Sequence, residues 1–400
     1  MIKTPFYARQ ILPKLKKYFL QPETVAITGM RRVGKTTLLK YLFGQTQSTN
    51  KLFWDLEDVL IRKIFQQDNY QDIKLVLEEE GLDFSKPVYI FLDEVQLAPN
   101  IVSVIKYFFD HYRVKFVVSG SSSFYFKHHF TESLAGRKFL VELHPLIFQE
   151  FLVFKGLKKK SYSTWVQKSG QKSQVEQSRY QQLYWEYVKY GGFPQVVLTK
   201  DTTLKKARLR EIVSSYFQLD VATLADFSDT ASLRDLLLLL TQRVGQKVNV
   251  SNLANTLGIS RQRVYDYVEF LEATYVVRLI SQKSSLDNQV SSQDKVYFSD
   301  TGLARILGEI DQGSQFENSV MMNLGYESDV TYYQTKSGGE IDFVVDKKVG
   351  LEVKQTATAQ NLSILRKRLQ SAGLEQGYVV TLNQNLQAKR LAQTIAAWNL

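Results

Sequence analysis

The sequence contains no cysteine, and this absence rules out disulfide bonds and thiolate-based metal sites. A reducing compartment such as the cytoplasm is therefore the expected location. The four histidines do not have the spacing of a zinc-binding pair. We interpret them as structural or surface residues: His111, His128, His129 and His144.

Long apolar segments are also missing. No apolar run approaches the roughly 20 residues that a helix needs to span a bilayer. The first residues lead into a charged amphipathic segment rather than an apolar one, so we expect neither a signal peptide nor a membrane partner. No internal repeat is found.

Basic residues outnumber acidic ones. The sequence has 51 Lys and Arg against 40 Asp and Glu, for a net charge of +11. A basic balance favours an anionic partner, with nucleic acid before a membrane surface. A basic surface that binds nothing is the alternative that charge alone leaves open. The 400 residues are too many for one hydrophobic core, so we expect two or three domains.

The most specific motif lies at residues 29–37, which read GMRRVGKTT and match G-x-x-x-x-G-K-[ST]. A short apolar run at 24–28 predicts a strand before it, and residues from 37 onward predict a helix after it. Two glycines let the backbone fold round a phosphate, while N–H groups at the helix start face the anion. Lys35 would reach the β- and γ-phosphates, and the Thr36 hydroxyl would hold Mg²⁺. We therefore predict that ATP is bound by Gly29, Gly34, Lys35, Thr36 and Thr37.

A second nucleotide-site signature closes the apolar run at 88–92. Asp93 would hold Mg²⁺ through water, and Glu94 would polarise the attacking water. Carboxylates that merely solvate the end of a strand are the alternative. The run at 114–118 ends in a serine-rich segment. If this strand lies next to the one at 88–92, Ser119 or Ser121 would sit beside the γ-phosphate.

Three arginines near these motifs have open roles. Arg137 is a candidate for stabilising the charge of the transferred phosphoryl group. If it comes from a neighbouring subunit, activity would depend on a homo-oligomer; an ordinary surface ion pair is the alternative. Arg31 and Arg32 lie inside the loop and could contact nucleotide, a lid or DNA.

The first part of the chain alternates apolar runs with helical patterns. Strands at 51–55, 88–92 and 114–118 are separated by helices at 59–66, 70–80 and 101–112, after a basic amphipathic helix at 7–19. This order predicts a parallel sheet covered on both faces. Residues 155–179 are rich in Lys, Ser and Gln, and we interpret them as a mobile insertion or loop. Helices at 180–189 and 204–224, split by a turn at 191–194, resemble a small helical lid.

Residues 253–265 show a helix–turn–helix pattern. Gly258 makes the turn and Ser260 caps the second helix. That helix would dock in the major groove of DNA through residues near its N-terminal end: Arg261, Gln262 and Arg263. Strands at 275–280 and 295–298 could form the wing of a winged helix. A protein–protein module is the alternative, and phosphate binding is expected before sequence readout.

The last part of the chain contains a cluster of charged residues on alternating strands. Strands at 340–345 and 351–354 place Asp342, Glu352 and Lys354 on one face of a hairpin, and Glu317 could reach them from the preceding helix. Such carboxylates bind Mg²⁺, and Lys354 would orient or activate the attacking water. The cluster resembles the PD-(D/E)xK nuclease core. Charges on a half-exposed hairpin are the alternative, and such domains often bind DNA without cutting it.

Further elements complete this part. Helices are predicted at 303–307, 315–324 and 361–370, strands at 330–334 and 377–380, and a closing helix at 388–398. This is an α/β unit of its own.

With these motifs in place, the chain resembles the AAA+-type ATPases of archaea and bacteria that carry a winged helix and a C-terminal restriction-endonuclease-like domain. The resemblance covers essentially the whole chain and is poorest at 155–179. Besides the C-terminal cluster, the residues that carry it are 29–36, 93–94, 119–121, 134–137, 191–194 and 300–303.

The predicted fold class is α/β, with a P-loop NTPase parallel sheet. An AAA+ P-loop ATPase core is expected at 1–154, an insertion and helical lid at 155–229, a winged-helix DNA-binding domain at 230–299 and a PD-(D/E)xK nuclease-like domain at 300–400. The predicted function is an ATPase, with ATP and Mg²⁺ as cofactors, that acts on DNA and carries a nuclease-like domain whose metal-dependent cleavage is open. The alternative is a non-cleaving, nucleotide-driven switch or scaffold that binds DNA or a protein partner.

Overall fold

The computed structural model describes residues 6–121, 134–158, 162–169, 174–222, 229–283, 293–325, 328–335, 338–383 and 393–400. They fall into two compact units. Unit 1 comprises Met1–His144, Tyr216–Ala225 and Ala273–Tyr275, and unit 2 comprises Pro145–Ser215, Asp226–Glu272 and Val276–Leu400. Two short segments from far along the chain therefore complete the N-terminal unit.

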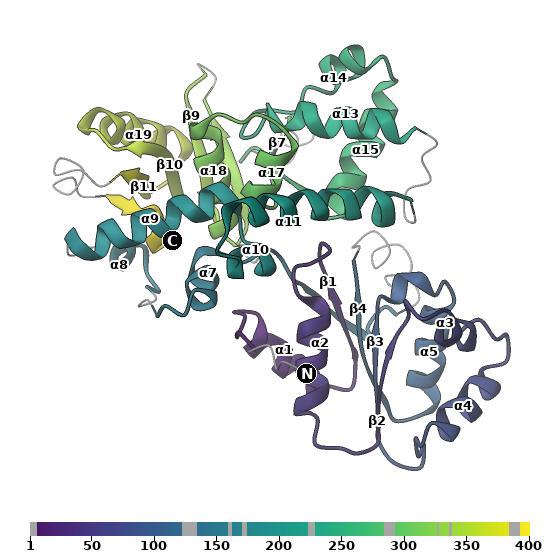
Figure 1. Ribbon diagram of the computed structural model, residues 1–400. Helices are drawn as coiled ribbons and strands as arrows, with labels where there is room; N and C mark the ends of the chain where they lie inside the picture. The colour runs from purple at the N-terminus through teal and green to yellow at the C-terminus, as the bar shows by residue number, and fades with distance from the viewer. Residues whose placement is uncertain are drawn as a thin grey trace. The chain divides into compact units, whose positions relative to one another are not determined.

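Unit 1 is built on a five-stranded sheet in the order β2-β3-β4-β1-β5 (Figure 1). Every strand pair in it is parallel, as the alternation of apolar runs and helices predicts. The strand β5 is absent from the sequence prediction, because its mixed charged and apolar residues give no clear run. The strands are β1 (Thr24–Thr28), β2 (Lys51–Asp55), β3 (Val88–Asp93), β4 (Val114–Gly120) and β5 (Lys138–Glu142).

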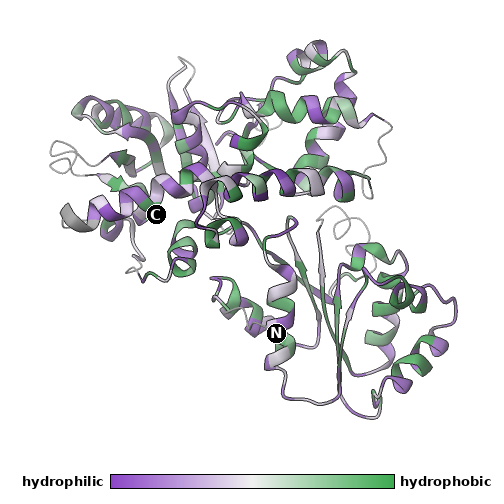
Figure 2. Cartoon of the chain, viewed as in Figure 1, coloured by the Kyte–Doolittle hydropathy of each residue, from purple (hydrophilic) through white to green (hydrophobic). Residues whose placement is uncertain are grey.

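Helices cover both faces of this sheet. Figure 1 shows α1 (Leu12–Phe19) and α2 (Lys35–Gln45) on one side. On the other side lie α3 (Val59–Ile64), α4 (Tyr70–Glu79) and α5 (Ile101–His111), which carry broad apolar stripes in Figure 2. The helix predicted at 7–19 begins only at Leu12, because Pro13 favours the first turn of a helix.

Within the described residues, unit 2 begins with five helices. They are α7 (Phe148–Phe154), α8 (Trp165–Ser169), α9 (Gln174–Tyr190), α10 (Pro194–Leu198) and α11 (Thr202–Ser215). The prediction of a loop over 155–179 is therefore wrong for α8 and for the start of α9, while 159–161 and 170–173 lie outside the described residues. The helix predicted at 204–224 divides in two, because α11 ends at Ser215 and a π-helical turn, Tyr216–Val221, follows in unit 1.

The helix–turn–helix pattern is present. Helix α13 (Thr230–Thr241) precedes α14 (Val250–Leu257) and α15 (Arg261–Ala273). Gly258 has a φ of 66°, and the Arg263 N–H donates to Ser260 Oγ over 3.1 Å. The predicted turn at Gly258 and the predicted helix cap at Ser260 are therefore confirmed. Strands β6 (Val277–Ile280) and β7 (Lys295–Phe298) pair antiparallel. Residues 284–292 of the predicted wing lie outside the described residues.

A second five-stranded sheet, in the order β12-β11-β10-β9-β8, forms the C-terminal part of unit 2. The strands β8, β9 and β10 are antiparallel, and β10, β11 and β12 are parallel. Its elements are α17 (Thr301–Leu307), α18 (Gln312–Asn323), β8 (Val330–Gln334), β9 (Glu340–Val345), β10 (Val349–Thr356), α19 (Ala359–Ala372), β11 (Gln376–Asn383) and β12 (Thr394–Ala396).

The closing helix predicted at 388–398 is wrong where the chain is described. Ile395 is buried and pairs with Val380 of β11, so β12 extends the sheet. A 3₁₀ turn, Ala397–Asn399, then buries Trp398. Residues 384–392 lie outside the described residues. Throughout the described ranges, no helix is both long and apolar enough to cross a membrane.

Candidate active sites

The glycine loop of unit 1 has the conformation that its sequence requires. Gly29 has a φ of 145°, and a Cβ there would lie 2.0 Å from the Leu143 carbonyl oxygen, so no other residue fits. Gly34 has a φ of 105° and directly precedes α2, whose first residue is Lys35. The loop therefore turns the chain from the carboxyl end of β1 into a helix start that includes Thr36 and Thr37, as predicted.

Lys35 lies buried across this loop. Its Nζ donates to the carbonyl oxygens of Gly29, over 2.9 Å, and Met30, over 3.1 Å. Burial lowers the pKa of Lys35, and the nearby carboxylates of Glu94 and Asp220 oppose that shift. The ammonium is thus held at the carboxyl edge of the sheet, where a bound phosphate would meet it.

Asp93 ends β3 and is almost fully buried. Burial raises its pKa, while hydrogen bonds from the hydroxyls of Ser119 and Thr36 lower it. Three elements, α2, β3 and β4, therefore bring their oxygen atoms together at one point. The strand β4 does lie next to β3, which is the condition on which the sequence prediction for Ser119 depended. Ser119 contacts Asp93, and its role at a nucleotide site stays a prediction.

Glu94 follows Asp93 in a left-handed backbone conformation, with a φ of 53°. For a residue other than glycine this conformation is uncommon and marks local strain. Its carboxylate is nearly buried and accepts a hydrogen bond of 2.5 Å from Gln96 Nε2. The same Nε2 donates to Ser121 Oγ over 3.1 Å, so Ser121 also faces this site.

One residue of the site is absent from the sequence prediction. Asp220 lies in the π-helical turn, is buried and accepts hydrogen bonds at Oδ1 from Arg31 Nε, over 3.0 Å, and Ser121 Oγ, over 2.8 Å. Burial raises its pKa, and Arg31 opposes that shift. Arg31 therefore has a defined partner in unit 1. For Arg32, the structure gives a φ of 65° within the loop.

The position of Arg137 contradicts the prediction that it has a catalytic role in its own subunit. Its carbonyl oxygen accepts from the N–H of Thr24, the first residue of β1, over 2.9 Å. Because all five strands are parallel, Arg137 lies at the amino edge of the sheet, opposite the loop. Its guanidinium pairs with Asp110 over 2.8 Å on the surface, which is the ordinary ion pair that the sequence left open.

In unit 2 the predicted C-terminal cluster converges. Asp342 from β9 and Glu352 from β10 are buried, which argues against charges on a wet hairpin face. Lys354 Nζ lies 2.8 Å from Glu352 Oε1 and 3.9 Å from Asp342 Oδ2. Burial, together with the charges of Glu317 and Glu352, raises the pKa of Asp342 to about 8. Glu317 itself accepts a hydrogen bond of 2.7 Å from the Tyr297 hydroxyl.

The donor set of this cluster does not fit a metal ion as it is arranged. Arg368 of α19 donates from Nη1 to both carboxylate oxygens of Glu352, over 3.0 and 2.9 Å. Asp342 Oδ2 accepts from the Val353 N–H over 2.7 Å. Within the described ranges, no group of three or more His, Cys, Asp or Glu residues could hold a metal ion. Glu352 is occupied by a cation of the chain itself.

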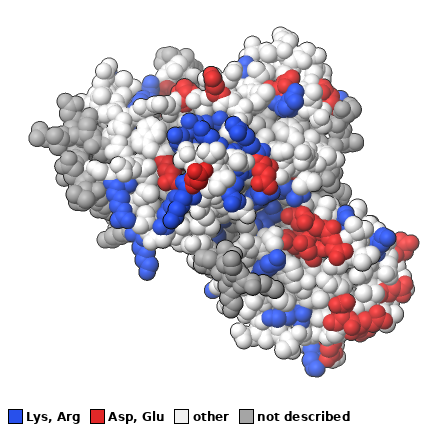
Figure 3. Space-filling model, viewed as in Figure 1, with Lys and Arg blue, Asp and Glu red and all other residues white. Residues whose placement is uncertain are grey.

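The predicted DNA-binding residues lie in the first turn of α15. Arg261 and Gln262 are exposed, and Gln262 Nε2 donates to Asp266 Oδ1 over 2.9 Å. The Arg263 guanidinium lies 5.9 Å from the centre of the Tyr267 ring. Figure 3 shows further Lys and Arg side chains over the middle of unit 2, near α11 and α17, whereas acidic side chains gather on unit 1.

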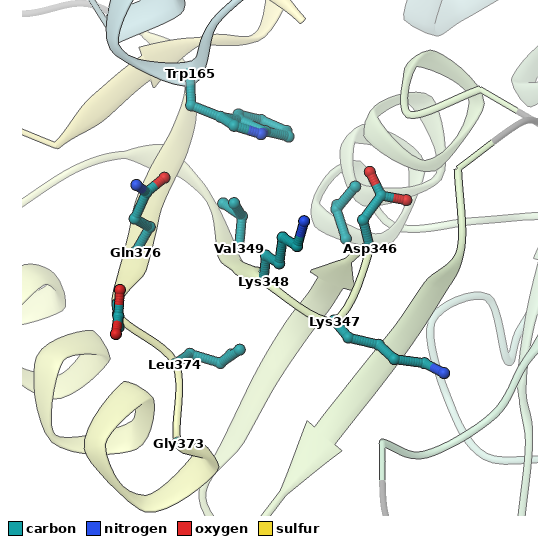
Figure 4. A pocket seen from close by; sticks show the side chains of 10 residues that line it. Trp165, Asp346, Lys347, Lys348, Val349, Gly373, Leu374 and Gln376 are labelled. Carbon is teal, nitrogen blue, oxygen red and sulfur yellow. The ribbon is translucent and has the colours of Figure 1, made fainter.

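Unit 2 also has a pocket of about 450 Å³ at the amino ends of β10 and β11 (Figure 4). Trp165 closes one side of it, and Lys347 and Lys348 line it together with Asp346 and Glu375. The pocket is thus lined by two basic and two acidic side chains, whose charges balance. None of the predicted site residues lines it. It therefore adds nothing to the predicted sites.

Three family models match parts of the chain. Residues 21–152 match the model of an AAA domain. Residues 181–314 and 312–400 match two models that are each described as a domain of unknown function, DUF8612 and DUF4143. The first match agrees with the glycine loop, Asp93 and the parallel sheet, so residues 21–152 are similar to an AAA domain. The winged-helix and nuclease-like assignments of the rest stay predictions.

Relatives occur in a bacterium and in an archaeon. An uncharacterised protein of Haemophilus influenzae is 29% identical over 364 residues, which cover 87% of this chain and 84% of that protein. An uncharacterised protein of Methanocaldococcus jannaschii is 26% identical over 330 residues, which cover 80% of this chain and 71% of that protein.

Solved structures resemble the chain only distantly. The Aeropyrum pernix ORC1 protein in complex with DNA aligns with a TM-score of 0.33 and 14% identity, over 76% of this chain and 93% of that chain. AMPPCP-bound DnaA from Aquifex aeolicus aligns with a TM-score of 0.26 and 15% identity, over 66% of this chain and 85% of that chain.

Proposed function

We propose that the protein hydrolyses ATP with Mg²⁺ and acts on DNA through a winged helix in unit 2. The ATPase half rests on one observation, the meeting of Lys35, Asp93 and Glu94 at the carboxyl edge of one parallel sheet. Lys35 would bind the phosphates as a cation. Thr36 and Asp93 offer hydroxyl and carboxylate oxygens, the ligands that Mg²⁺ prefers, and bound Mg²⁺ would neutralise charge on the phosphate oxygens.

Glu94 is the candidate general base. Its carboxylate is nearly buried and its charge acts on Asp93, which supports a role in taking a proton from a water that attacks the γ-phosphate. Ser119, which is hydrogen-bonded to Asp93, links this point to the neighbouring strand. A base fixed near the reacting water lowers the barrier by orientation as well as by proton transfer.

The DNA half rests on the helix–turn–helix with its capped second helix. Arg261, Gln262 and Arg263 occupy the first turn of α15, the part that enters the major groove in this motif. The exposed basic residues Lys206, Arg210 and Arg305 add positive charge elsewhere in unit 2. Binding is therefore expected to depend strongly on salt, because phosphate contacts release counterions.

The test is ATP turnover with and without duplex DNA. The wild-type protein should hydrolyse ATP, and DNA should change its rate. Lys35→Ala should lose nucleotide binding, whereas Glu94→Gln should bind ATP and lose turnover. Lys40→Ala, an exposed lysine on the same helix, is the matched control and should behave as wild type. Absence of turnover in the wild type, with and without DNA, would contradict the proposal.

A second candidate function is a nucleotide-driven switch whose C-terminal domain does not cut DNA. The hydrogen bonds from Arg368 Nη1 to both oxygens of Glu352 favour it, because a carboxylate held by an arginine is a poor metal ligand. Incubation of plasmid and linear DNA with Mg²⁺ or Mn²⁺ should then give no cleavage. Cleavage by the wild type that Asp342→Ala lacks would instead establish a nuclease.

A further inference from the structure

A chain of hydrogen bonds crosses the nucleotide site of unit 1. It begins at Arg31 in the glycine loop, passes through Asp220 and Ser121, and reaches Gln96, whose amide holds the Glu94 carboxylate. Its links measure 3.0 Å, 2.8 Å, 3.1 Å and 2.5 Å. Nothing in the sequence pattern or in the family match gives Asp220 a role at this site.

The direction of each bond is fixed by chemistry. The Asp220 carboxylate can only accept hydrogen bonds, so the Ser121 hydroxyl must donate its single proton to Asp220. Ser121 then has only lone pairs left for Gln96, whose Nε2 donates to it. The same Nε2 donates to Glu94, so the amide is held with its nitrogen toward the carboxylate. Removing the Asp220 carboxylate would free the Ser121 hydroxyl to rotate, and the amide would lose its fixed acceptor.

The other end of the Gln96 amide is also informative. Gln96 is buried, and its Oε1 has no hydrogen-bond donor among the described residues. A buried acceptor without a donor costs free energy, so such an atom suits a site that a water molecule enters. Oε1 belongs to the same amide that holds Glu94. A water that donates a hydrogen bond to Oε1 would lie close to Glu94, the candidate base.

The segment that carries Asp220 is itself anchored in unit 1. Tyr216, at the start of the π-helical turn, is buried, and its hydroxyl lies 2.9 Å from Thr274 Oγ1. The other anchor is the ion pair of Asp220 with Arg31, whose two side chains are largely buried. π-Helical turns are often found at functional sites. The turn therefore holds the Asp220 carboxylate in a defined place.

We propose that Asp220 is a positioning residue for ATP hydrolysis: through Ser121 and Gln96 it orients Glu94 toward the attacking water, and it fixes Arg31 in the glycine loop. This inference rests on the ATPase activity proposed above. Asp220 does not itself contact the reacting atoms. Its loss should therefore slow turnover more than it weakens nucleotide binding.

The test compares Asp220→Ala and Ser121→Ala with the wild type in steady-state ATP turnover and in binding of a fluorescent ATP analogue. Both variants should lower kcat by about 10-fold or more and leave KM and the analogue's Kd within about 3-fold. The double variant should be no slower than the slower single variant, because both changes cut one chain. Thr199→Ala, a partly exposed hydroxyl in α10's C-cap, is the control and should keep the wild-type kcat.

Several results would overturn this inference. If folded Asp220→Ala or Ser121→Ala keeps kcat within about twofold of wild type, the chain does not position Glu94. Equal losses in kcat and in analogue binding would mean a purely structural role. Ser121→Ala removes a single oxygen and keeps the Arg31 ion pair, so it decides the question if Asp220→Ala fails to fold. A wild type that binds ATP without turnover would overturn the proposed function and this inference together, whereas normal turnover in both variants would overturn this inference alone.

Discussion

The Asp300 carboxylate accepts a hydrogen bond of 2.6 Å from the backbone N–H of Gly192, which lies 108 residues earlier in the chain. Its other oxygen accepts from the Leu303 N–H over 2.9 Å and caps the start of α17. Two of the motifs that carry the family resemblance, at 191–194 and 300–303, are therefore halves of one buried joint. Their pairing explains both motifs by packing rather than by catalysis.

Replacing Gly191 by alanine should break this joint. Gly191 has a φ of 73°, and a Cβ there would lie 2.0 Å from Asp300 Oδ1. The carboxylate cannot move without giving up its bonds to Gly192 and Leu303. We expect Gly191→Ala to lower the free energy of unfolding by about 3 kcal/mol or more, measured by urea denaturation.

Gly156→Ala is the matched control for this variant. Gly156 has nearly the same φ, 72°, but a Cβ there would meet nothing within 4 Å. It should cost only the backbone strain of about 1 kcal/mol. Equal losses of stability in the two variants would mean that the contact with Asp300 contributes nothing.

Asp300 should also make stability depend on pH. Burial raises the pKa of Asp300 to about 6, against an ordinary value of about 4 in the unfolded chain. Folding then takes up a proton between these two values, so the stability of the wild type should fall as pH rises from about 4 to about 6. The loss amounts to about 3 kcal/mol, and Asp300→Asn should lack it because it cannot titrate.

Parallel pH series of urea denaturation for the two proteins isolate this effect. Other carboxylates titrate in the same range, but they do so in both proteins and cancel in the difference. A constant difference in unfolding free energy between pH 4 and pH 7 would show that the pKa of Asp300 is not raised.

Much of this fold could be predicted because its signals are local. The loop at 29–37, the strand end at Asp93 and the turn at Gly258 each follow from a few neighbouring residues and their backbone needs. The hairpin of β9 and β10 follows in the same way, since period-two patterns fix which side chains share a face. These are features that a single sequence can carry.

What could not be predicted depends on distant chain segments. Asp220 lies 189 residues from Arg31, and no spacing in the sequence shows that the turn after α11 returns to the first unit. The position of Arg137 depends on the direction of the strand β5. This strand could not be predicted, because it has no clear apolar run. Arg368 occupies Glu352 from a helix whose exposed face looks ordinary in sequence. Local sequence patterns identify the residues of a site that belong to its own motifs, but not the residues that distant segments of the chain contribute.

The arginines at the start of α15 should carry part of the DNA affinity. We expect Arg261→Ala and Arg263→Ala each to weaken binding to a labelled duplex and to lower the slope of log K against log salt by about 1, as for a lost phosphate contact. Fluorescence anisotropy at several salt concentrations measures both quantities. Arg234→Ala, an exposed arginine on α13 beside Asp235, is the control. The same loss with Arg234→Ala would point to general charge and not to α15.

The pair of Arg368 with Glu352 should hold the C-terminal sheet together. Glu352 is buried, so Arg368→Met leaves a carboxylate with Lys354 as its remaining cation and should lower the free energy of unfolding by about 2 kcal/mol. Glu352→Gln alone should cost less, because Arg368 is partly exposed and water can solvate it. The double variant should therefore be more stable than the sum of the two losses predicts, by about 1 kcal/mol or more in a denaturation cycle. Additive losses would mean that the two side chains do not stabilise each other.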